Sequence, residues 1–262
     1  MNFSFELKDE PLDGWNDYLT KNEIGNIYNT TGYAEYAKKW LGWKPLFCRV
    51  IDQSGNISLQ VLLFEYVSSI EKIPTFFHGL IKNLRNTLRW NYGPVSILQE
   101  PTSFFFANIS KKYKRLYGTT HPLSDLNYDY LKKTSWNTFL IDLTKQKEEL
   151  YKNMSKHNAR KNIERSIERN VIVEEINDQT LEEYWILFNK YRISMKLLEV
   201  KKEELEDMWN SLRNFGFHGV IARNDDRVIG GLLFSSFNEY INEWGVARSE
   251  EDYEEKLYAQ DL

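Results

Sequence analysis

Hydrophobic and polar positions alternate in two stretches of the chain, and each stretch predicts an antiparallel hairpin. Residues 45–67 hold two β-rich runs around the polar turn 52–56, and residues 217–237 hold two more around the turn 224–226. Gly, Asn and Asp in these turns are residues that tight connections favour. The second runs contain similar apolar segments, Val61–Phe64 and Gly231–Phe234, which indicates an internal repeat.

The elements on either side of the hairpins repeat in the same order. Apolar residues recur at helical spacing before each hairpin, in 33–41 and in 180–191. Thr180 and Glu183 have the spacing of a capping box at the start of the second helix. A strand is predicted after each hairpin, at 89–97 and 239–247. This repeated order predicts two domains, 1–137 and 138–262.

The segment between the two halves combines a predicted strand with a basic helix. Residues 136–143 alternate like a strand, and Thr144 is a candidate N-cap for a long helix. Residues 145–170 carry eight Lys or Arg and four Glu, whereas the whole chain has a formal net charge of −4. Lys152, Lys156 and Arg160 recur at four-residue spacing and would form a row on one helix face.

Composition narrows the class of protein. The 262 residues are 42% hydrophobic and 27% charged, which is typical of a folded globular chain. No apolar run approaches the ~18 residues of a membrane span, and the N-terminus lacks the pattern of a secretion signal. Cys48 is the single cysteine, so an internal disulfide is excluded, and the widely spaced histidines predict no metal site. We therefore expect a cytoplasmic protein.

Four stretches resemble the Fem family of peptidoglycan-bridge aminoacyltransferases and its acetyltransferase-like relatives. They are the helix with its LGW-x-P ending at 29–45, the GPV strand at 91–95, the segment 138–173 from the Asp-Leu strand into the basic helix, and 228–251. The third is the strongest match. The four stretches occur in the same order as in the family and together span roughly residues 28 to 250.

The resemblance implies an α/β (α+β) fold with tandem GNAT-like domains (GCN-five-related acetyltransferase type), whose mixed, largely antiparallel sheets are flanked by helices. In that fold the sheet splays at a strand bulge and the acyl donor lies in the gap. Family members transfer an acyl or aminoacyl group to an amine. The implied donor is an aminoacyl-tRNA or an acyl-CoA, which the sequence leaves undetermined, and no cofactor is expected to stay bound.

Two features depart from the family pattern. CoA-binding relatives carry a glycine-rich loop after the fourth strand, but here 246–256 has no such glycines and five carboxylates. Their charge would repel a pyrophosphate, which disfavours CoA. In addition, the chain ends at Leu262 inside an apparent helix, so we expect the second domain to be incomplete.

The candidate site residues follow from the chemistry of amide formation. Glu243, on the strand before Trp244-Gly245, is the candidate general base. By motif position, Arg160 matches the family arginine of the connecting helix. Anionic groups of an acceptor are expected to meet basic side chains, and flat groups to stack on aromatic ones. The substrate-binding candidates are Tyr36, Lys38, Lys39, Trp43, Arg160, Lys161, Arg165, Tyr240 and Trp244.

Three functional hypotheses remain open at this point. The first is an N-acyl- or aminoacyltransferase that acts on an amine carried by a phosphate- or nucleotide-linked substrate, with tRNA as a possible donor. The basic run 111–115 would be a contact for tRNA phosphates, or simply a solvated helix end. The second is a non-catalytic tandem-GNAT binding or scaffold protein. The third is a CoA-dependent small-molecule N-acetyltransferase. The oligomeric state is not predicted.

Overall fold

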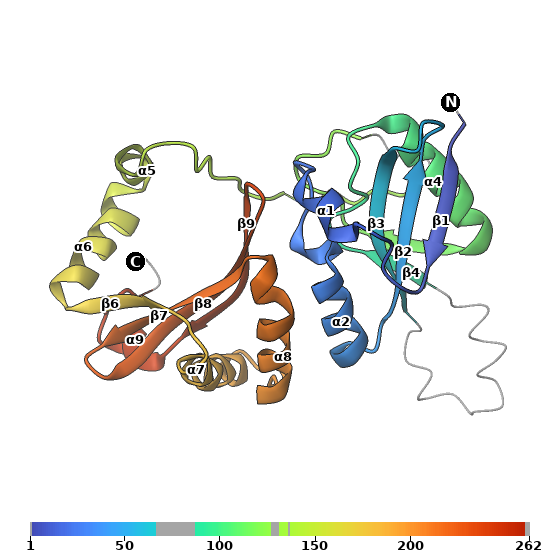
Figure 1. Ribbon diagram of the computed structural model, residues 1–262. Coiled ribbons are helices and arrows are strands. Elements are labelled where there is room, and N and C mark those ends of the chain that lie inside the picture. The colour runs from blue at the N-terminus through green and yellow to red at the C-terminus, as the bar shows by residue number, and fades with distance from the viewer. Residues whose placement is uncertain (1, 67–86, 127–130, 136, 260–262) are drawn as a thin grey trace. The chain divides into compact units, whose positions relative to one another are not determined.

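The computed structural model describes residues 2–66, 87–126, 131–135 and 137–259, which divide into two compact units (Figure 1). Unit 1 comprises Met1–Trp136 and Phe237–Tyr240, and unit 2 comprises Asn137–Ser236 and Ile241–Leu262. Each unit contains one β-sheet with helices packed on it. None of the helices in these ranges is both long and apolar enough to span a membrane.

Unit 1 is built on a five-stranded sheet. Its order is β1-β2-β3-β4-β5, antiparallel except for the parallel pair β4–β5. The elements of unit 1 are β1 Ser4–Lys8, α1 Trp15–Thr20, η1 Ile27–Asn29, α2 Thr31–Trp40, β2 Lys44–Ile51, β3 Ile57–Tyr66, β4 Thr87–Trp90, α4 Gln99–Lys112 and β5 Arg115–Gly118. The first predicted hairpin is therefore β2–β3.

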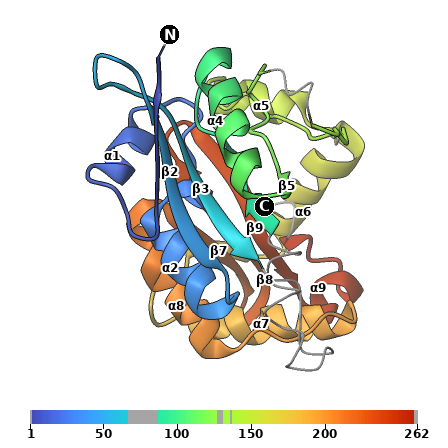
Figure 2. The same ribbon diagram turned by 90° about the vertical axis from the view of Figure 1, so that its right-hand side faces the viewer.

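Helices cover both faces of this sheet because its central strands are apolar on both sides. Cys48, Val61 and their neighbours on the same face form one core with Phe105 of α4. On the opposite face, Phe47 packs edge-on against Trp15, with ring centroids 4.8 Å apart. Figure 2 shows β2 and β3 between α4 on one side and α1 and α2 on the other.

The predicted strand 89–97 is interrupted, and a buried asparagine fills the interruption. β4 pairs with β3 only up to Arg89, and pairing resumes at Val95 opposite Gln60. Between these points the Leu62 N–H donates to Asn29 Oδ1 (2.9 Å). Asn29 Nδ2 in turn donates to the carbonyl of Asn91 (3.2 Å). The side chain thus replaces the missing strand partner, because a buried N–H needs an acceptor.

Unit 2 is built on a four-stranded sheet with the order β6-β7-β8-β9. β6, β7 and β8 are antiparallel, and the second predicted hairpin is β7–β8. The elements of unit 2 are α5 Lys147–Asn153, η3 Lys156–Arg160, α6 Lys161–Glu168, β6 Val171–Glu175, α7 Leu181–Ser194, α8 Lys202–Leu212, η4 Arg213–Phe215, β7 Phe217–Asn224, β8 Arg227–Phe237, β9 Tyr240–Arg248 and α9 Glu250–Glu254.

Two successive glycines of β8 show how the faces of this sheet are covered. A Cβ on Gly231 would lie 2.7 Å from Tyr184 of α7, and a Cβ on Gly230 would lie 3.0 Å from Ala259. Successive strand residues point to opposite faces, so α7 and the stretch around Ala259 cover opposite faces. Glycine at 231 lets the ring of Tyr184 approach the backbone closely.

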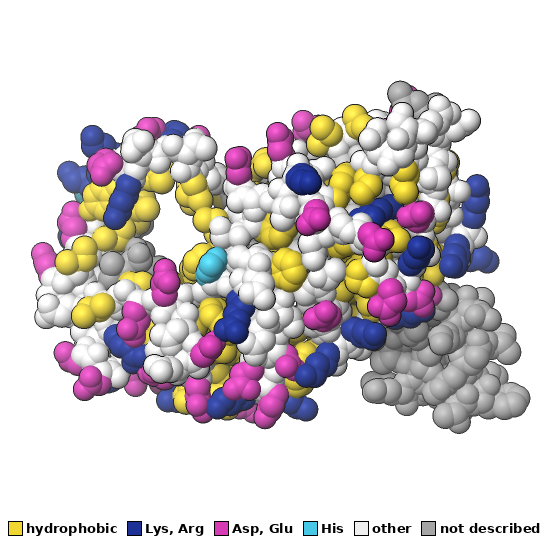
Figure 3. Space-filling model, in the orientation of Figure 1, with side chains coloured by type: hydrophobic (Ala, Val, Ile, Leu, Met, Phe, Trp, Pro, Cys, Tyr) yellow, Lys and Arg dark blue, Asp and Glu magenta, His cyan; other side chains and the backbone are white. Residues whose placement is uncertain are grey.

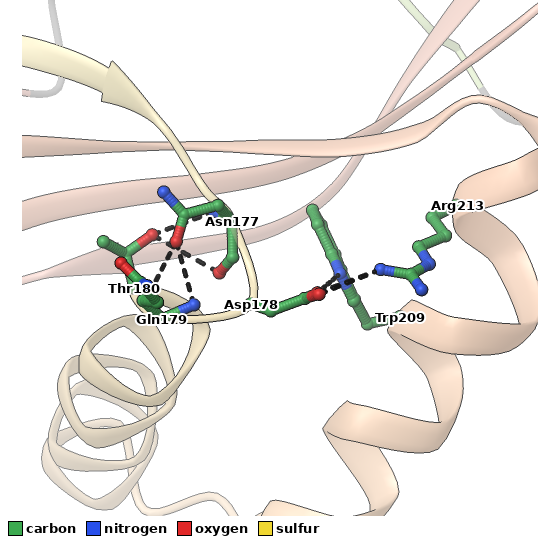
Figure 4. Close-up of polar contacts among 6 residues, drawn as sticks. All are labelled: Asn177, Asp178, Gln179, Thr180, Trp209 and Arg213. Atoms are coloured by element: carbon green, nitrogen blue, oxygen red, sulfur yellow. Dashed lines mark hydrogen bonds and ion pairs between the residues drawn. The ribbon is translucent and has the colours of Figure 1, made fainter.

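The predicted capping box at Thr180 is wrong. Thr180 Oγ1 accepts the Asn177 N–H (2.9 Å), and Asn177 Oδ1 accepts the N–H of Gln179 and of Thr180 (Figure 4). Glu183 reaches Arg223 instead, where it makes two hydrogen bonds of 2.7 and 2.9 Å. An Asx-type turn therefore starts α7, because Asn accepts from the backbone two residues on.

The connection between Asp178 and α8 fixes the same end of α7. Asp178 accepts from the indole N–H of Trp209 (3.1 Å) and from Arg213 (3.0 Å), and Figure 4 shows both groups converging on this carboxylate. The turn before α7 is thereby tied to the end of α8.

The segment between the two predicted halves differs from expectation. Residues 137–142 form no strand, and residue 136 lies outside the described residues. Thr144 caps no helix; its hydroxyl donates to Asp142 (2.6 Å), and the first helix starts at Lys147. The long basic helix is broken at Met154, whose backbone is extended.

Candidate functional site

The basic segment contains an unusual helical turn. After the break at Met154, residues Lys156–Arg160 form a π-helical turn that continues into α6. The Arg160 N–H donates to the Ser155 carbonyl (3.1 Å), five residues earlier. Turns of this kind are rare and occur often at functional sites. The turn ends on the arginine that the sequence motif singled out.

Arg160 is half-buried, and part of its hydrogen-bonding capacity is unused. Its guanidinium carbon lies 6.0 Å from the ring centroid of Tyr151, whose hydroxyl donates to Glu164 (3.0 Å). Arg160 Nε is buried and has no hydrogen-bond partner among the described residues. A buried guanidinium donor without an acceptor is costly, so an anionic ligand would satisfy it.

Two further basic residues of this segment contact Tyr258. Arg165 donates to the Tyr258 hydroxyl (3.3 Å), and its guanidinium carbon lies 5.6 Å from the ring centroid. Arg169 donates to the carbonyls of Glu255 and Lys256. Arg165 and Arg169 therefore anchor the stretch after α9, whereas Lys161 is exposed at the start of α6.

The candidates from the first half lie together on α2 and the turn that follows it. Lys38 and Lys39 are exposed in the last turn of α2, and Lys39 Nζ lies 5.6 Å from the ring centroid of Trp40. Tyr36 packs near Tyr33, with 6.1 Å between ring centroids. Trp43, in the turn after α2, is half-buried.

Sequence reasoning missed Arg89, which covers Trp43. The Arg89 guanidinium carbon lies 4.0 Å from the Trp43 ring centroid, a close cation–π contact. Its Nε is buried without a hydrogen-bond partner among the residues that the structure describes. Arg89 pairs opposite Phe64 and so lies on the α2 face of the sheet. The sequence signal that could have identified Arg89 is its charge between two apolar residues, Leu88 and Trp90, which are both buried.

β9 carries the candidate base on the exposed end of one strand face. Ile241 and Glu243 are exposed, as expected for one strand face, but Gly245 of the same predicted face is buried. The Gly245 carbonyl accepts the Tyr184 hydroxyl (3.1 Å). Gly245 and Ala247 are therefore buried on the face that carries Glu243, because α7 covers this end of the strand and leaves Ile241 and Glu243 exposed.

The two aromatic candidates of β9 have different surroundings. Trp244 packs edge-on against Phe217, with ring centroids 5.2 Å apart, which indicates a role in the core of unit 2. Tyr240 belongs to unit 1, where its ring centroid lies 4.8 Å from that of His121. Burial raises the pKa of Tyr240, so its hydroxyl stays protonated at neutral pH.

The acidic turn after β9 should repel an anionic ligand less than its composition suggests. Asp252 is buried, pairs with Arg248 and accepts the Ala259 N–H (2.8 Å). Glu255 accepts two hydrogen bonds from Arg227 (3.1 and 3.2 Å), and this pairing holds its pKa below the usual value. Two of the five carboxylates are thus neutralised by arginines, which weakens the electrostatic argument against CoA.

A cavity of about 710 Å³ lies beside this turn in unit 2. Its walls are the second half of α7, the start of β8 and residues 248–251. Lys190, Arg227 and Arg248 are among its lining side chains, and Ile186 and Ile193 give it an apolar side. No group of three His, Cys, Asp or Glu side chains in the described ranges is placed to hold a metal.

Comparison with solved structures decides the fold. The structure of FemX superposes on this chain with a TM-score of 0.72, covering 98% of this chain and 84% of FemX. The chain has the fold of FemX. A conserved protein of unknown function from Bacteroides thetaiotaomicron VPI-5482 is also similar, with a TM-score of 0.52, over 98% of this chain and 86% of that protein.

Both similarities are structural, since the sequence identity is 12% in each case. No family model and no curated protein matches the sequence. The predicted architecture, with mixed and largely antiparallel sheets flanked by helices, is confirmed. The resemblance to the Fem family therefore holds for the fold.

Proposed function

We propose that this chain is an N-acyltransferase or aminoacyltransferase that forms an amide on an amine acceptor bearing a phosphate- or nucleotide-linked group. The observation that carries the proposal is the FemX fold over 98% of the chain. The scaffold alone does not fix an activity. The second support is therefore local: a π-helical turn that ends at Arg160, whose buried Nε has no protein acceptor in the described chain.

Amide formation has separate requirements, and different residues are proposed to meet them. The amine must lose a proton, meet the acyl carbonyl, and have the developing oxyanion stabilised. Glu243 is exposed on β9 and serves as the proposed base. Arg160 and Lys161 serve as the proposed contacts for the acceptor's anionic group, since guanidinium and ammonium donors both bind phosphate. The donor, aminoacyl-tRNA or acyl-CoA, stays undetermined.

Binding of uridine diphosphate and of pyrophosphate, measured by calorimetry, tests the anion site. Arg160→Ala should weaken binding by about tenfold or more, as expected for loss of a charge-assisted contact. Lys21→Ala removes the same charge from an exposed position after α1 and should leave the affinity unchanged. Equal affinities for wild type and Arg160→Ala would refute the assignment of Arg160.

A CoA-dependent acetyltransferase is the second candidate, and the paired acidic turn favours it. Arg227 and Arg248 neutralise Glu255 and Asp252, and the adjoining cavity of about 710 Å³ carries Lys190. Calorimetric titration with acetyl-CoA separates the two candidates. Saturable binding that Lys190→Ala weakens would support acetyl-CoA as donor, and absence of binding would leave the aminoacyl donor.

A further inference from the structure

Basic side chains gather at one end of the sheet of unit 1. β1 ends where β2 begins, and the start of β2 lies beside the end of β3, with Lys44 opposite Glu65. β4 and β5 begin at this same end, because β4 runs antiparallel to β3 and parallel to β5. α4 ends there as well, since Tyr113, the residue after it, donates to Glu65 (3.2 Å). We call this the basic end of unit 1, and its cations are Lys8, Lys44, Lys111, Lys112, Lys114 and Arg115.

The positive charge at the basic end has few carboxylates to balance it. All six side chains are exposed, and Figure 3 shows Lys and Arg side chains along the border of unit 1 where α4 lies. Lys44 forms an ion pair with Asp9 (2.9 Å) that lowers the pKa of this carboxyl, and Lys112 lies near enough to lower it further. Within the described ranges, the other five cations make no ion pair with a carboxylate. Residues 101–124 contain four Lys or Arg and no Asp or Glu, although the whole chain has a net charge of −4.

The make-up of the basic end fits a charged plane better than a nucleic acid. Five of its six cations are lysines, which act as flexible point charges, whereas arginine forks favour specific phosphate contacts. They come from both edges of a five-stranded sheet, so the charge spreads over about 20 Å at ~4.8 Å per strand. Tyr113, the aromatic residue within the run 111–115, is buried, so its ring cannot stack on a base. Clustered basic side chains of this kind are attracted to anionic lipid headgroups.

We propose that the basic end of unit 1 docks this protein on the surface of an anionic lipid bilayer. The lysine ammonium groups contact headgroup phosphates, and their flexible stems adapt to the plane of the membrane. The contact is electrostatic and weakens as salt is added, because the Debye length falls from about 30 Å at 0.01 M to about 8 Å at 0.15 M ionic strength. Each cation close to such a surface contributes about fivefold in affinity. This surface lies within unit 1 and does not depend on the reaction proposed above.

Co-sedimentation with lipid vesicles at low salt tests the proposal. Wild type should bind vesicles of phosphatidylcholine that contain about one-third phosphatidylglycerol, and should not bind pure phosphatidylcholine. The triple variant Lys111→Gln, Lys112→Gln, Lys114→Gln should bind the anionic vesicles about 100-fold more weakly. All three side chains are exposed, so the variant should fold normally, which urea unfolding checks.

The matched control removes the same charge from another basic segment. The triple variant Lys147→Gln, Lys152→Gln, Lys156→Gln changes three exposed lysines of unit 2 and should leave vesicle binding unchanged. Equal weakening by the two triple variants would overturn the proposal, because net charge rather than the basic end would then set the affinity. Wild type that ignores anionic vesicles at low salt would also overturn it. If such a protein instead bound a tRNA, and the first triple variant abolished that binding, the basic end would be a nucleic-acid surface.

Discussion

Asn29 is the side chain whose removal should damage unit 1 most specifically. It is fully buried, and its Oδ1 accepts the N–H of Leu62, which is also fully buried. Its Nδ2 donates to Asn26 Oδ1 (3.0 Å) and to the carbonyls of Asn91 (3.2 Å) and Tyr92 (3.4 Å). Asn29→Ala removes this set of partners at once, between the Phe64–Arg89 and Gln60–Val95 strand pairs.

The size of the effect follows from the groups left behind. A buried N–H without an acceptor costs about 1–3 kcal/mol. The Tyr92 carbonyl keeps a donor, because Asn26 Nδ2 lies 2.7 Å away. The Asn91 carbonyl loses its contact with Asn29, and a small void remains. Together these changes should lower the free energy of unfolding of unit 1 by about 3 kcal/mol.

Urea unfolding and amide hydrogen exchange measure this loss. Exchange at Leu62 should accelerate most, because its acceptor is gone. Asn108→Ala is the matched control, since it removes one hydrogen bond to the Phe104 carbonyl within α4 and improves helix propensity. Unchanged protection at Leu62, or a stability change below about 0.5 kcal/mol, would refute the role of Asn29 as a substitute strand partner.

Three further predictions concern packing and pH. Gly231→Ala should destabilise unit 2 by about 1–3 kcal/mol in urea unfolding, because the new Cβ meets the Tyr184 ring at 2.7 Å; truncating the ring as well should restore part of the loss, and no loss would contradict the close packing. Burial lowers the pKa of His121, so the unfolded chain takes up its proton first and stability should fall as pH drops below about 6.5; His121→Gln should remove that dependence. Hydrogen bonding to Arg223 lowers the pKa of Glu183. The stability that this pairing contributes is present above the usual carboxyl pKa and is lost as pH falls through the depressed value. Arg223→Met should therefore reduce the fall in the free energy of unfolding of unit 2 that wild type shows below about pH 4.3, measured by urea unfolding across a pH series.

Local patterns predicted the elements that depend on neighbouring residues. Val61–Phe64 are fully buried in β3, and the turns 52–56 and 224–226 close the predicted hairpins β2–β3 and β7–β8. These elements could be read from the sequence because side-chain alternation and turn chemistry act over a few residues. Their assembly into a FemX-like fold required motif order as well.

The features that sequence reasoning missed depend on distant partners. The predicted strand 89–97 is interrupted because Asn29, sixty residues earlier in the chain, completes β3. Glu183 does not complete a capping box, because its carboxylate pairs with Arg223, forty residues away in the chain. Arg89 was overlooked because its relation to Trp43 exists only in the folded sheet. Segment 138–143 has strand propensity, but no neighbouring strand in the described chain satisfies it.

Transfer of a labelled acyl group to an amine tests the central claim most directly. The purified protein would receive labelled aminoacyl-tRNAs or labelled acetyl-CoA together with nucleotide-linked amino-sugar or aminoacyl acceptors, and amide product would be quantified. We predict amide formation with at least one donor, a loss of about 100-fold with Glu243→Gln, as for removal of a general base, and a raised acceptor KM with Arg160→Ala. Absence of transfer from every donor, or transfer that neither substitution alters, would contradict the account.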